Sequence, residues 1–408
     1  MSSVEFLSSY RTLPEPLYSD CTPQEFASPK CVAFNTPLSN YLQLQSLLST
    51  DQDKAEVLSG NRIPPSAQPL AQSYAGHQYG NFTNLGDGRA LLLGELLATD
   101  GKLFDLQLKG SGRTPYSRRG DGLAALGPML REFLISEAMY ALGVPTTRSL
   151  AVVTTGEEVM RDGVKQGAVL SRVAASHIRV GTFEFAAALN DTEIIKKLTD
   201  YTIERHYPEI QSKDTKYADF LNASLKRQAE LVSKWMLFGF VHGVLNTDNV
   251  AISGETIDYG PCAFIDQYDP EKTFSSIDRD GRYSLGNQAS IVQWNMARFA
   301  ETLIPLLDTE NRNGIDVANQ ALRNFIQYFQ EAFFSAMRRK IGLAQEHEGD
   351  QKLIQNLLEI MQREKMDYTG TFLELERSLA VENLVSASAL DSWMIGWRGR
   401  THIKSMSA

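Results

Sequence analysis

The chain has 408 residues, of which 43% are hydrophobic and 22% charged, with a formal net charge of -9 and a pI of about 5.3. This is the composition of a globular protein long enough for one large domain or two lobes. The acidic balance argues against binding of nucleic acid or an anionic membrane, so any polyanion site has to be local. The N-terminus lacks the apolar core of a signal peptide, and no apolar run approaches the roughly 20 residues that span a bilayer. The three cysteines form no CxxC pair and no zinc spacing, so we expect a cytoplasmic protein.

The first part of the chain predicts a β-rich region that contains one helix. Residues 1–70 are rich in Pro, Ser and Thr and predict an irregular wrapping segment with one helix around Asn40–Leu48. Two apolar runs, Ala90–Leu97 and Leu103–Lys109, are separated by Thr-Asp-Gly-Lys and predict a hairpin. A helix with the sequence MLREFLISEAMYAL follows Pro128. Further strands are predicted at Arg148–Thr155 and Gly167–Arg172.

After Gly181 the apolar residues recur at three- and four-residue spacing, which predicts helices. These helices are predicted at Phe183–Leu189, Glu193–Tyr207, Lys216–Phe240, Ile291–Leu307, Val317–Ile341, Leu353–Glu364 and Thr371–Leu379, with a short strand at Cys262–Asp266. The predicted class is therefore α+β, a bilobal protein-kinase-like fold. Its parts are a wrapping segment (residues 1–70), a β-rich N-lobe (71–180) and a helical C-lobe with the catalytic and metal-binding loops (181–408).

A glycine-rich turn and a strand lysine are the first candidates for chemistry. The turn Gly86-Asp87-Gly88-Arg89 permits close approach of the backbone to a phosphate, although a plain tight turn explains the glycines equally well. Lys109 ends a strand, and a glutamate of the next helix, Glu132 or Glu137, can hold it as kinases hold their strand lysine. The alternative is an exposed lysine at the end of a strand with two solvated glutamates, and spacing alone does not exclude it.

Five arginines near glycine-rich loops form a second group of candidates. A local cluster of this kind in an acidic protein favours phosphate binding, because guanidinium groups bind phosphate oxygens in pairs. The alternative is an ordinary solvated surface. The arginines are Arg113, Arg118, Arg119, Arg172 and Arg179.

The most informative segment is HGVLNTDN followed by IDYG. In kinase-like enzymes a histidine-led loop precedes a metal-binding Asn, and an Asp before an aromatic residue and Gly completes the site. Asn249 and Asp258 have this order and predict a magnesium site, with Mn²⁺ as the alternative ion. The usual catalytic Asp, two residues after the histidine, is replaced by Val244. Asp248 is the nearest carboxylate that could serve as the base instead.

The motifs YAGHQYGNF, LGDGRALLLGE, LKGSGRTPYSRRGDG, GVPTTRSLAVV, HGVLNTDN, ETIDYGP and WNMARFAE together resemble the selenoprotein-O family. The resemblance is strong over residues 70 to 305. It implies a kinase-like fold without the usual catalytic aspartate, in agreement with Val244. The implied activity is transfer of AMP from ATP, bound in a flipped orientation, to Ser, Thr or Tyr hydroxyls of proteins, including the enzyme itself.

The resemblance also implies roles for individual residues. Lys109 would contact phosphates and pair with Glu132, and Asp248 would be the base. Asn249 and Asp258 would hold the metal. The residues implied to contact the nucleotide are Gly86, Gly88, Arg89, Lys109, Asp121, Gly122, Arg172, Arg179 and Asp258.

Members of the family usually end in two cysteines or a cysteine and a selenocysteine. This sequence has no cysteine after Cys262, so regulation through such a pair is left open. Two other functions remain alternatives: a nucleotide-binding pseudokinase scaffold and a conventional phosphotransferase. We expect the chain to be a monomer.

Overall fold

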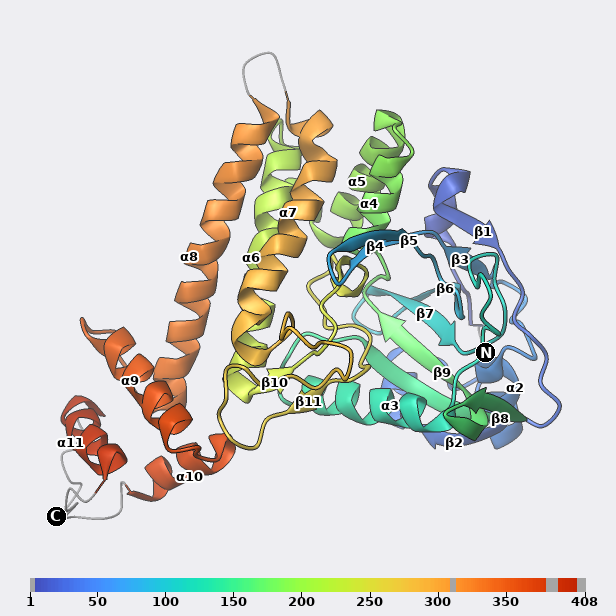
Figure 1. Ribbon diagram of the computed structural model, residues 1–408. Helices are drawn as coiled ribbons and strands as arrows, with labels where there is room; N and C mark the ends of the chain where they lie inside the picture. Colours follow the sequence, from blue (N-terminus) through green and yellow to red (C-terminus); the bar gives the residue numbers. More distant parts are fainter. Residues whose placement is uncertain (1–3, 309–312, 379–387, 402–408) are drawn as a thin grey trace. The chain divides into compact units, whose positions relative to one another are not determined.

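The computed structural model describes residues 4–308, 313–378 and 388–401 (Figure 1). The chain divides into two compact units, and all the predicted site residues belong to the first. The first unit comprises Met1–Ser224, Asn246–Gly260 and Trp294–Ala321, and the second comprises Leu225–Leu245, Pro261–Gln293 and Leu322–Ala408. No helix among the described residues combines the length and apolarity that a membrane crossing requires.

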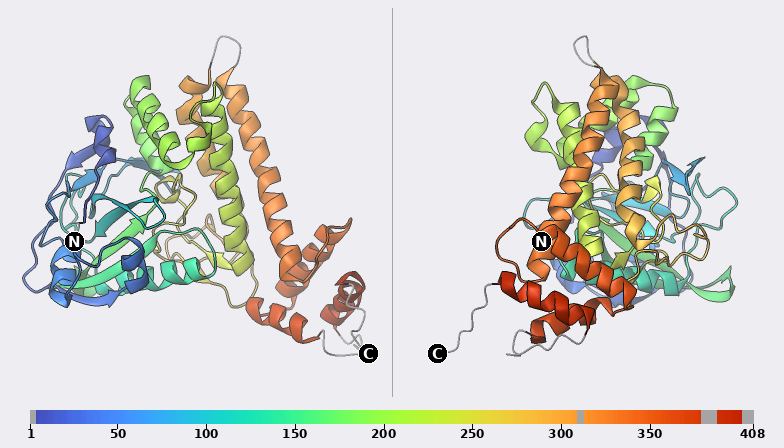
Figure 2. Two further views of the ribbon diagram at one scale, coloured as in Figure 1. Left: turned by 180° about the vertical axis from the view of Figure 1, so that it is seen from behind. Right: turned by 60° about the vertical axis from the view of Figure 1, so that its left-hand side comes forward.

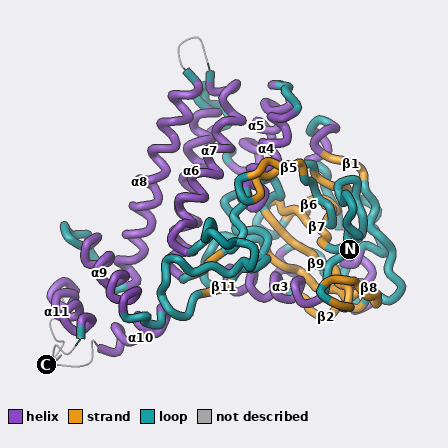
Figure 3. Tube along the Cα trace, viewed as in Figure 1, coloured by secondary structure: helices purple, strands orange, loops and turns teal. Residues whose placement is uncertain are grey.

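A seven-stranded antiparallel sheet forms the centre of the first unit, in the order β1-β3-β6-β7-β9-β8-β2. Its strands are β1 (Tyr18–Asp20), β2 (Lys30–Phe34), β3 (Leu70–Gln72), β6 (Ala90–Leu97), β7 (Leu103–Lys109), β8 (Arg148–Arg161) and β9 (Gly163–Ala174). The register places Gln107 of β7 opposite Arg172 of β9. Figure 3 shows these strands in orange, with the shorter hairpin of β4 (Ala75–Gln78) and β5 (Asn81–Asn84) as a separate two-stranded sheet.

Helix α3 (Leu126–Ala141) packs on β8 and β9 (Figures 1 and 2). Met129 of the helix is buried in a cluster with Val152 and Leu170. A second cluster joins apolar side chains of the first 60 residues, such as Phe26 and Leu58, to strand residues of the sheet. The N-terminal segment thus contributes directly to the core that holds the strands in place.

The remaining elements are mostly helical. In the second unit, residues of the last helices pack into one apolar cluster that includes Met337, Leu357 and Trp397. The other strands are β10 (Phe240–Val241) and β11 (Ala263–Phe264). The other helices are α1 (Thr36–Tyr41), α2 (Asp51–Ser59), α4 (Val180–Ala188), α5 (Thr192–His206), α6 (Lys216–Phe238), α7 (Gln288–Leu307), α8 (Gly314–Lys340), α9 (Asp350–Arg363), α10 (Tyr368–Ser378) and α11 (Ala389–Thr401). Short 3-10 turns are η1 (Ser9–Thr12), η2 (Glu15–Leu17), η3 (Pro208–Ile210), η4 (Thr247–Asn249) and η5 (Leu285–Asn287).

The predicted α+β class, with a sheet-rich N-terminal part and a helical C-terminal part, is confirmed. The helix predicted around Asn40–Leu48 is wrong. Two short helices flank that segment, α1 with the Asn35 side chain as its N-cap and α2 with a capping box from Thr50. These caps satisfy backbone donors at the two helix starts, so the helices begin at their caps and residues 42–48 are left as turns. The end of the last predicted helix, Leu379, lies outside the described residues.

Candidate nucleotide-binding active site

A buried network of two cations and two anions lies at the end of β7. Lys109 Nζ donates to Glu132 Oε2 at 2.7 Å, and Arg172 Nη2 donates to Glu132 Oε1 at 2.5 Å. Both cations also pair with Asp258, Lys109 directly and Arg172 at 3.0 Å. The network forms because β7 and β9 are neighbours in the sheet and α3 packs across β9. The glutamate that holds Lys109 is therefore Glu132.

Glu137, the other candidate, points elsewhere. It accepts hydrogen bonds from Arg148 Nε at 2.7 Å and from Asn35 Nδ2 at 2.7 Å. The two glutamates are five residues apart on one helix, which turns them to different faces. Only Glu132 faces Lys109.

Opposite charges decide the protonation of the network. Burial raises the pKa of Glu132, but the charges of Arg172 and Lys109 outweigh burial and lower it. Burial likewise raises the pKa of Asp258, and the charges of Lys109, Arg172 and Arg89 bring it well below its usual range. Both carboxyl groups are therefore ionised at neutral pH. Burying three of these charges, those of Lys109, Glu132 and Arg172, is expensive even when they are paired, which points to function rather than to stability alone.

Asp258 also has an uncommon backbone conformation, with φ of 68°. A non-glycine residue held in the left-handed region costs about 1–3 kcal/mol, and such residues concentrate at functional sites. Its side chain remains 32% exposed, whereas that of Glu132 is only 2% exposed. Asp258 is thus the member of the network that presents oxygen toward solvent.

Most of the predicted site residues meet around one small cavity of about 100 Å³. Glu132 does not line it and lies in the network beneath. The cavity is lined by Tyr74, Asp87, Gly88, Arg89, Ala90, Gln107, Lys109, Arg172, Arg179, Asp248, Asn249 and Asp258. Cationic side chains and the amide and carboxylate oxygens of Asn249 and Asp258 therefore line the same space.

The other predicted residues, Gly86, Asp121 and Gly122, line a larger cavity of about 950 Å³. This cavity shares Tyr74, Gly88 and Arg89 with the small one, so the two adjoin. Its wall includes the three remaining arginines of the predicted cluster, Arg113, Arg118 and Arg119. The sequence cluster thus divides between two cavities, with Arg172 and Arg179 at the small one.

Two residues of the larger cavity, Asp121 and Gly86, also make contacts that hold the structure together, and the sequence did not reveal these contacts. Asp121 pairs with Arg161 at 2.8 and 3.0 Å, and this hydrogen bond lowers its pKa. Gly86 has φ of 89°, and a Cβ there would lie 2.4 Å from the ring of Tyr116. Its glycine is therefore required for packing as well as for any approach of a phosphate.

Asp248 is enclosed by close-packed backbone. A Cβ on Gly76 would lie 2.4 Å from Asp248 Oδ1, and Arg179 Nη1 donates to the Asp248 carbonyl oxygen at 3.1 Å. Within the described residues, Oδ1 is buried and accepts no hydrogen bond. Burial raises the pKa of Asp248 to about 6, although the charge of Arg179 opposes it. A carboxyl group in this state is suited to exchanging protons near neutral pH.

Asn249 and Asp258 fit a hard cation. One amide and one carboxylate at the same cavity suit Mg²⁺, which keeps several waters and shares its remaining positions with phosphate oxygens. The described residues contain no cluster of three or more His, Cys, Asp or Glu side chains that could hold a metal alone. The donor set therefore suits an ion that arrives with a nucleotide.

Sequence reasoning missed Asp87 as a site residue. Its side chain is buried and accepts from the Gln72 N–H at 3.1 Å and from Gln107 Nε2 at 3.3 Å. Burial raises the pKa of Asp87 to about 6, against the charges of Arg179 and Arg172. Its place between two glycines of the phosphate-type turn was the available signal.

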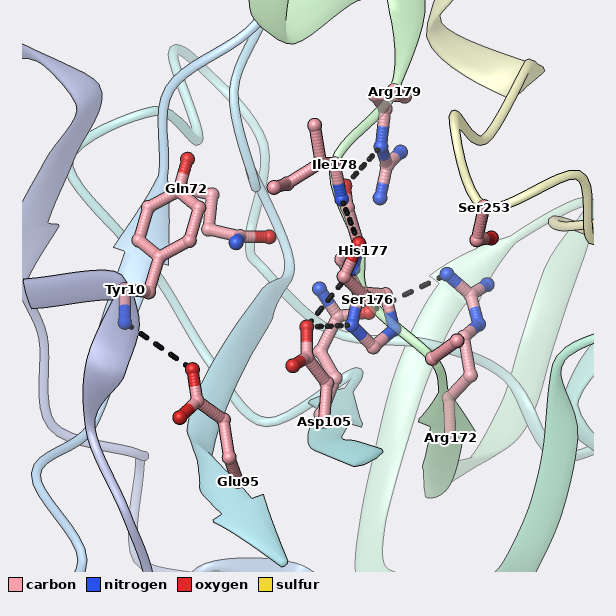
Figure 4. A network of polar contacts seen from close by, with 12 residues as sticks. Tyr10, Gln72, Glu95, Asp105, Arg172, Ser176, His177, Ile178, Arg179 and Ser253 are labelled. Carbon is pink, nitrogen blue, oxygen red and sulfur yellow. Dashed lines mark hydrogen bonds and ion pairs between the residues drawn. The ribbon is translucent and has the colours of Figure 1, made fainter. Parts of the chain in front are cut away.

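A second polar network, around Asp105 and His177, lies beside the two cavity arginines (Figure 4). Asp105 Oδ2 accepts from the backbone N–H of His177 at 2.9 Å and contacts His177 Nδ1 at 3.0 Å, while Arg205 pairs with Oδ1 at 2.6 Å. Burial lowers the pKa of His177 to about 4, so this ring is neutral. The network fixes the segment between Arg172 and Arg179.

A strand lysine tethered by a helix glutamate, beside a loop Asn and Asp, is the nucleotide-site arrangement of kinase-type transferases. The family model described as "Protein adenylyltransferase SelO" matches residues 1–395. The chain belongs to this family of protein adenylyltransferases. The predicted family and enzyme class are confirmed.

Curated relatives of similar sequence are named "Protein nucleotidyltransferase YdiU". The one from Shouchella clausii is 52% identical over 396 residues, covering 97% of this chain and 82% of the relative. The one from Halalkalibacterium halodurans is 55% identical over 371 residues, covering 91% of this chain and 75% of the relative. Among solved structures, ROP2 from Toxoplasma gondii, a virulence factor with a protein-kinase fold and no enzymatic activity, is 9% identical with a TM-score of 0.31. That match covers 80% of this chain and 86% of ROP2, and is too distant to inform the site.

Proposed function

We propose that this protein transfers AMP from ATP to Ser, Thr or Tyr hydroxyls of proteins, itself included, in a Mg²⁺-dependent reaction in the cytoplasm, acting as a monomer. The observation that carries the proposal is the network of Lys109, Glu132, Arg172 and Asp258 beside a cavity that Asp248 and Asn249 also line. Family membership supports the nucleotidyl-transfer chemistry.

The cations account for binding of the triphosphate. Lys109, Arg172 and Arg179 offer ammonium and guanidinium donors to its oxygens, and the turn at Gly88 allows the chain to approach. Asn249 and Asp258 would hold the Mg²⁺, which supplies charge neutralisation on the departing pyrophosphate. Holding these groups in fixed positions lowers the barrier because few of them have to reorganise during the reaction.

The chemical step then needs one proton acceptor. The acceptor hydroxyl oxygen forms a bond to the α-phosphorus, and the bond from that phosphorus to the oxygen bridging to the β-phosphate breaks. Pyrophosphate leaves with that oxygen. The hydroxyl proton goes to the carboxylate of Asp248, which lines the small cavity. The larger cavity, with Gly86, Asp121 and Gly122, would take the nucleoside.

Incubation with Mg²⁺ and ATP labelled at either the α- or the γ-phosphate tests the proposal. Retention of the α-label alone on protein is the expected result, since the γ-phosphate leaves in pyrophosphate. Retention of the γ-label would establish the conventional phosphotransferase, despite Val244 at the usual base position. Binding of ATP without any transfer would establish the pseudokinase scaffold.

A further inference from the structure

The hairpin of β4 and β5 connects the loop that carries Asp248 (residues 246–249, called the catalytic loop below) to an open strand edge. Its turn residues Tyr79 and Gly80 both have positive φ, 51° and 85°, as the type I′ hairpin turn requires. One edge of the hairpin is bonded to the catalytic loop. The His77 N–H donates to Thr247 Oγ1 at 2.7 Å, and the Tyr79 N–H donates to Asn246 Oδ1 at 3.1 Å. The hairpin is thus fixed to the residues that precede Asp248.

The other edge of the hairpin, β5, carries main-chain N–H and C=O groups that do not pair with β4. The bond from the Leu85 N–H to the Tyr74 carbonyl, 2.9 Å, sets which residues face β4, because antiparallel pairs alternate. By that alternation the N–H and C=O groups of Phe82 and Asn84 point away from β4. Among the described residues, no strand, bridge or hydrogen bond engages them. Such an edge is a template for adding an extended segment of another chain.

An ordered aromatic surface accompanies this edge. Phe82 is 47% exposed, and its ring packs at 5.4 Å from that of His77, which in turn lies 5.3 Å from the ring of Trp294. His77 Nδ1 is held by Glu184 Oε1 at 2.5 Å. Because these rings are already fixed, an apolar side chain docking on Phe82 orders little on the enzyme side.

The edge also leads to the nucleotide site. β5 ends at Asn84, and Gly86 and Gly88, which line the two cavities, follow at once. A segment added to β5 therefore ends beside Gly86. Since an extended chain advances about 3.3 Å per residue, a hydroxyl two or three residues beyond the docked part reaches roughly 7–10 Å further.

We propose that β5 is the docking edge for an extended segment of the acceptor protein, which pairs with Phe82 and Asn84 through main-chain hydrogen bonds and presents its hydroxyl a few residues beyond the Gly86 end. This inference rests on the proposed protein-AMP transfer. Recognition of this kind selects acceptors that are locally unfolded or have a free strand. It does not require a particular acceptor sequence, because the hydrogen bonds are made by main-chain groups that every residue carries.

The test is Asn84→Pro, with Asn84→Ala as its matched control. Proline removes the outward N–H but leaves the hairpin bonds intact, because Asn84 does not bond to β4, and edge positions tolerate proline. Casein, a largely unfolded acceptor, serves as probe. Its binding to the ATP-loaded protein is measured by fluorescence anisotropy, its modification by label transfer, and ATP affinity by calorimetry.

We expect Asn84→Pro to weaken casein binding and to lower kcat/KM for casein about 5- to 10-fold, which corresponds to the loss of one main-chain hydrogen bond. ATP affinity should stay within about twofold, and Asn84→Ala should match the native protein. Equal casein binding by the proline variant would overturn the docking edge. Absence of AMP transfer by the native protein, with casein binding still sensitive to Asn84→Pro, would overturn the proposed function alone. If the proline variant loses ATP affinity, Phe82→Ser is tested instead. We expect Phe82→Ser to weaken casein binding and Phe82→Tyr to restore it. Unchanged casein binding by Phe82→Ser would then contradict the docking edge.

Discussion

Replacement of Glu132 by glutamine tests whether the buried network is held together by charge. Glu132 accepts from Lys109 at 2.7 Å and from Arg172 at 2.8 and 2.5 Å, and its side chain is only 2% exposed. Without its charge, Lys109 and Arg172 share the single carboxylate of Asp258, which leaves one excess positive charge in the network.

Removing one partner of a buried ion pair costs about 3–5 kcal/mol, and because glutamine keeps one accepting oxygen we expect about 3 kcal/mol for Glu132→Gln. Urea unfolding at pH 7 measures this loss directly. AMP transfer should fall about 100-fold or more, because Lys109 loses the contact that positions it.

Glu137→Gln on the same helix is the matched control. Glu137 is also paired, with Arg148, but its side chain is 21% exposed and it lines neither cavity. We expect a stability loss of about 1 kcal/mol or less and nearly unchanged transfer. Equal effects of the two substitutions on transfer, or native stability of Glu132→Gln, would refute the charge-network reasoning.

Three further predictions address single residues. Lys109→Ala should weaken ATP binding about 10-fold or more by calorimetry, since a buried charged donor is lost; unchanged affinity would return Lys109 to a purely structural role. Asp248→Asn should lower kcat about 100-fold with ATP affinity within about threefold, as expected for a proton acceptor that does not hold the nucleotide; loss of ATP binding instead would argue that the residue shapes the cavity. Burial raises the pKa of Glu255 to about 7. The folded state therefore binds the Glu255 proton more tightly than the unfolded state, and stability falls as pH rises from about 4.5 to about 7 by up to about 3 kcal/mol. Glu255→Gln should flatten this dependence in urea unfolding at pH 5 and pH 8; an identical pH dependence of variant and native protein would mean that Glu255 is ionised in the fold at both values.

Local sequence signals predicted the two strands and the helix that carry Lys109, Arg172 and Glu132. The apolar runs Ala90–Leu97 and Leu103–Lys109 coincide with β6 and β7, because a tight turn and residue composition act over a few neighbours. The strands contributed by the first 72 residues were not predicted. β1 and β3 are three residues each and pair Tyr18 with Gln72, a contact that no local pattern encodes.

In the candidate site, too, contacts between residues far apart in the sequence could not be predicted. Spacing left Glu132 and Glu137 as alternatives, since only the packing of α3 on the sheet turns one of them toward Lys109. The sequence analysis grouped the five arginines into one cluster because all of them lie near glycine-rich loops. In the structure they line two different cavities. The motif YAGHQYG forms part of a hairpin that is bonded to Asn246 and Thr247, partners about 170 residues away that no local pattern encodes.

The most direct test of the account is the intact mass of an acceptor protein after incubation with the enzyme, ATP and Mg²⁺, followed by fragmentation to locate the modified residue. We expect an increase of one adenylyl group on a Ser, Thr or Tyr side chain, and no increase with Asp258→Ala. An increase of one phosphoryl group, or an adenylyl group that persists with Asp258→Ala, would contradict it.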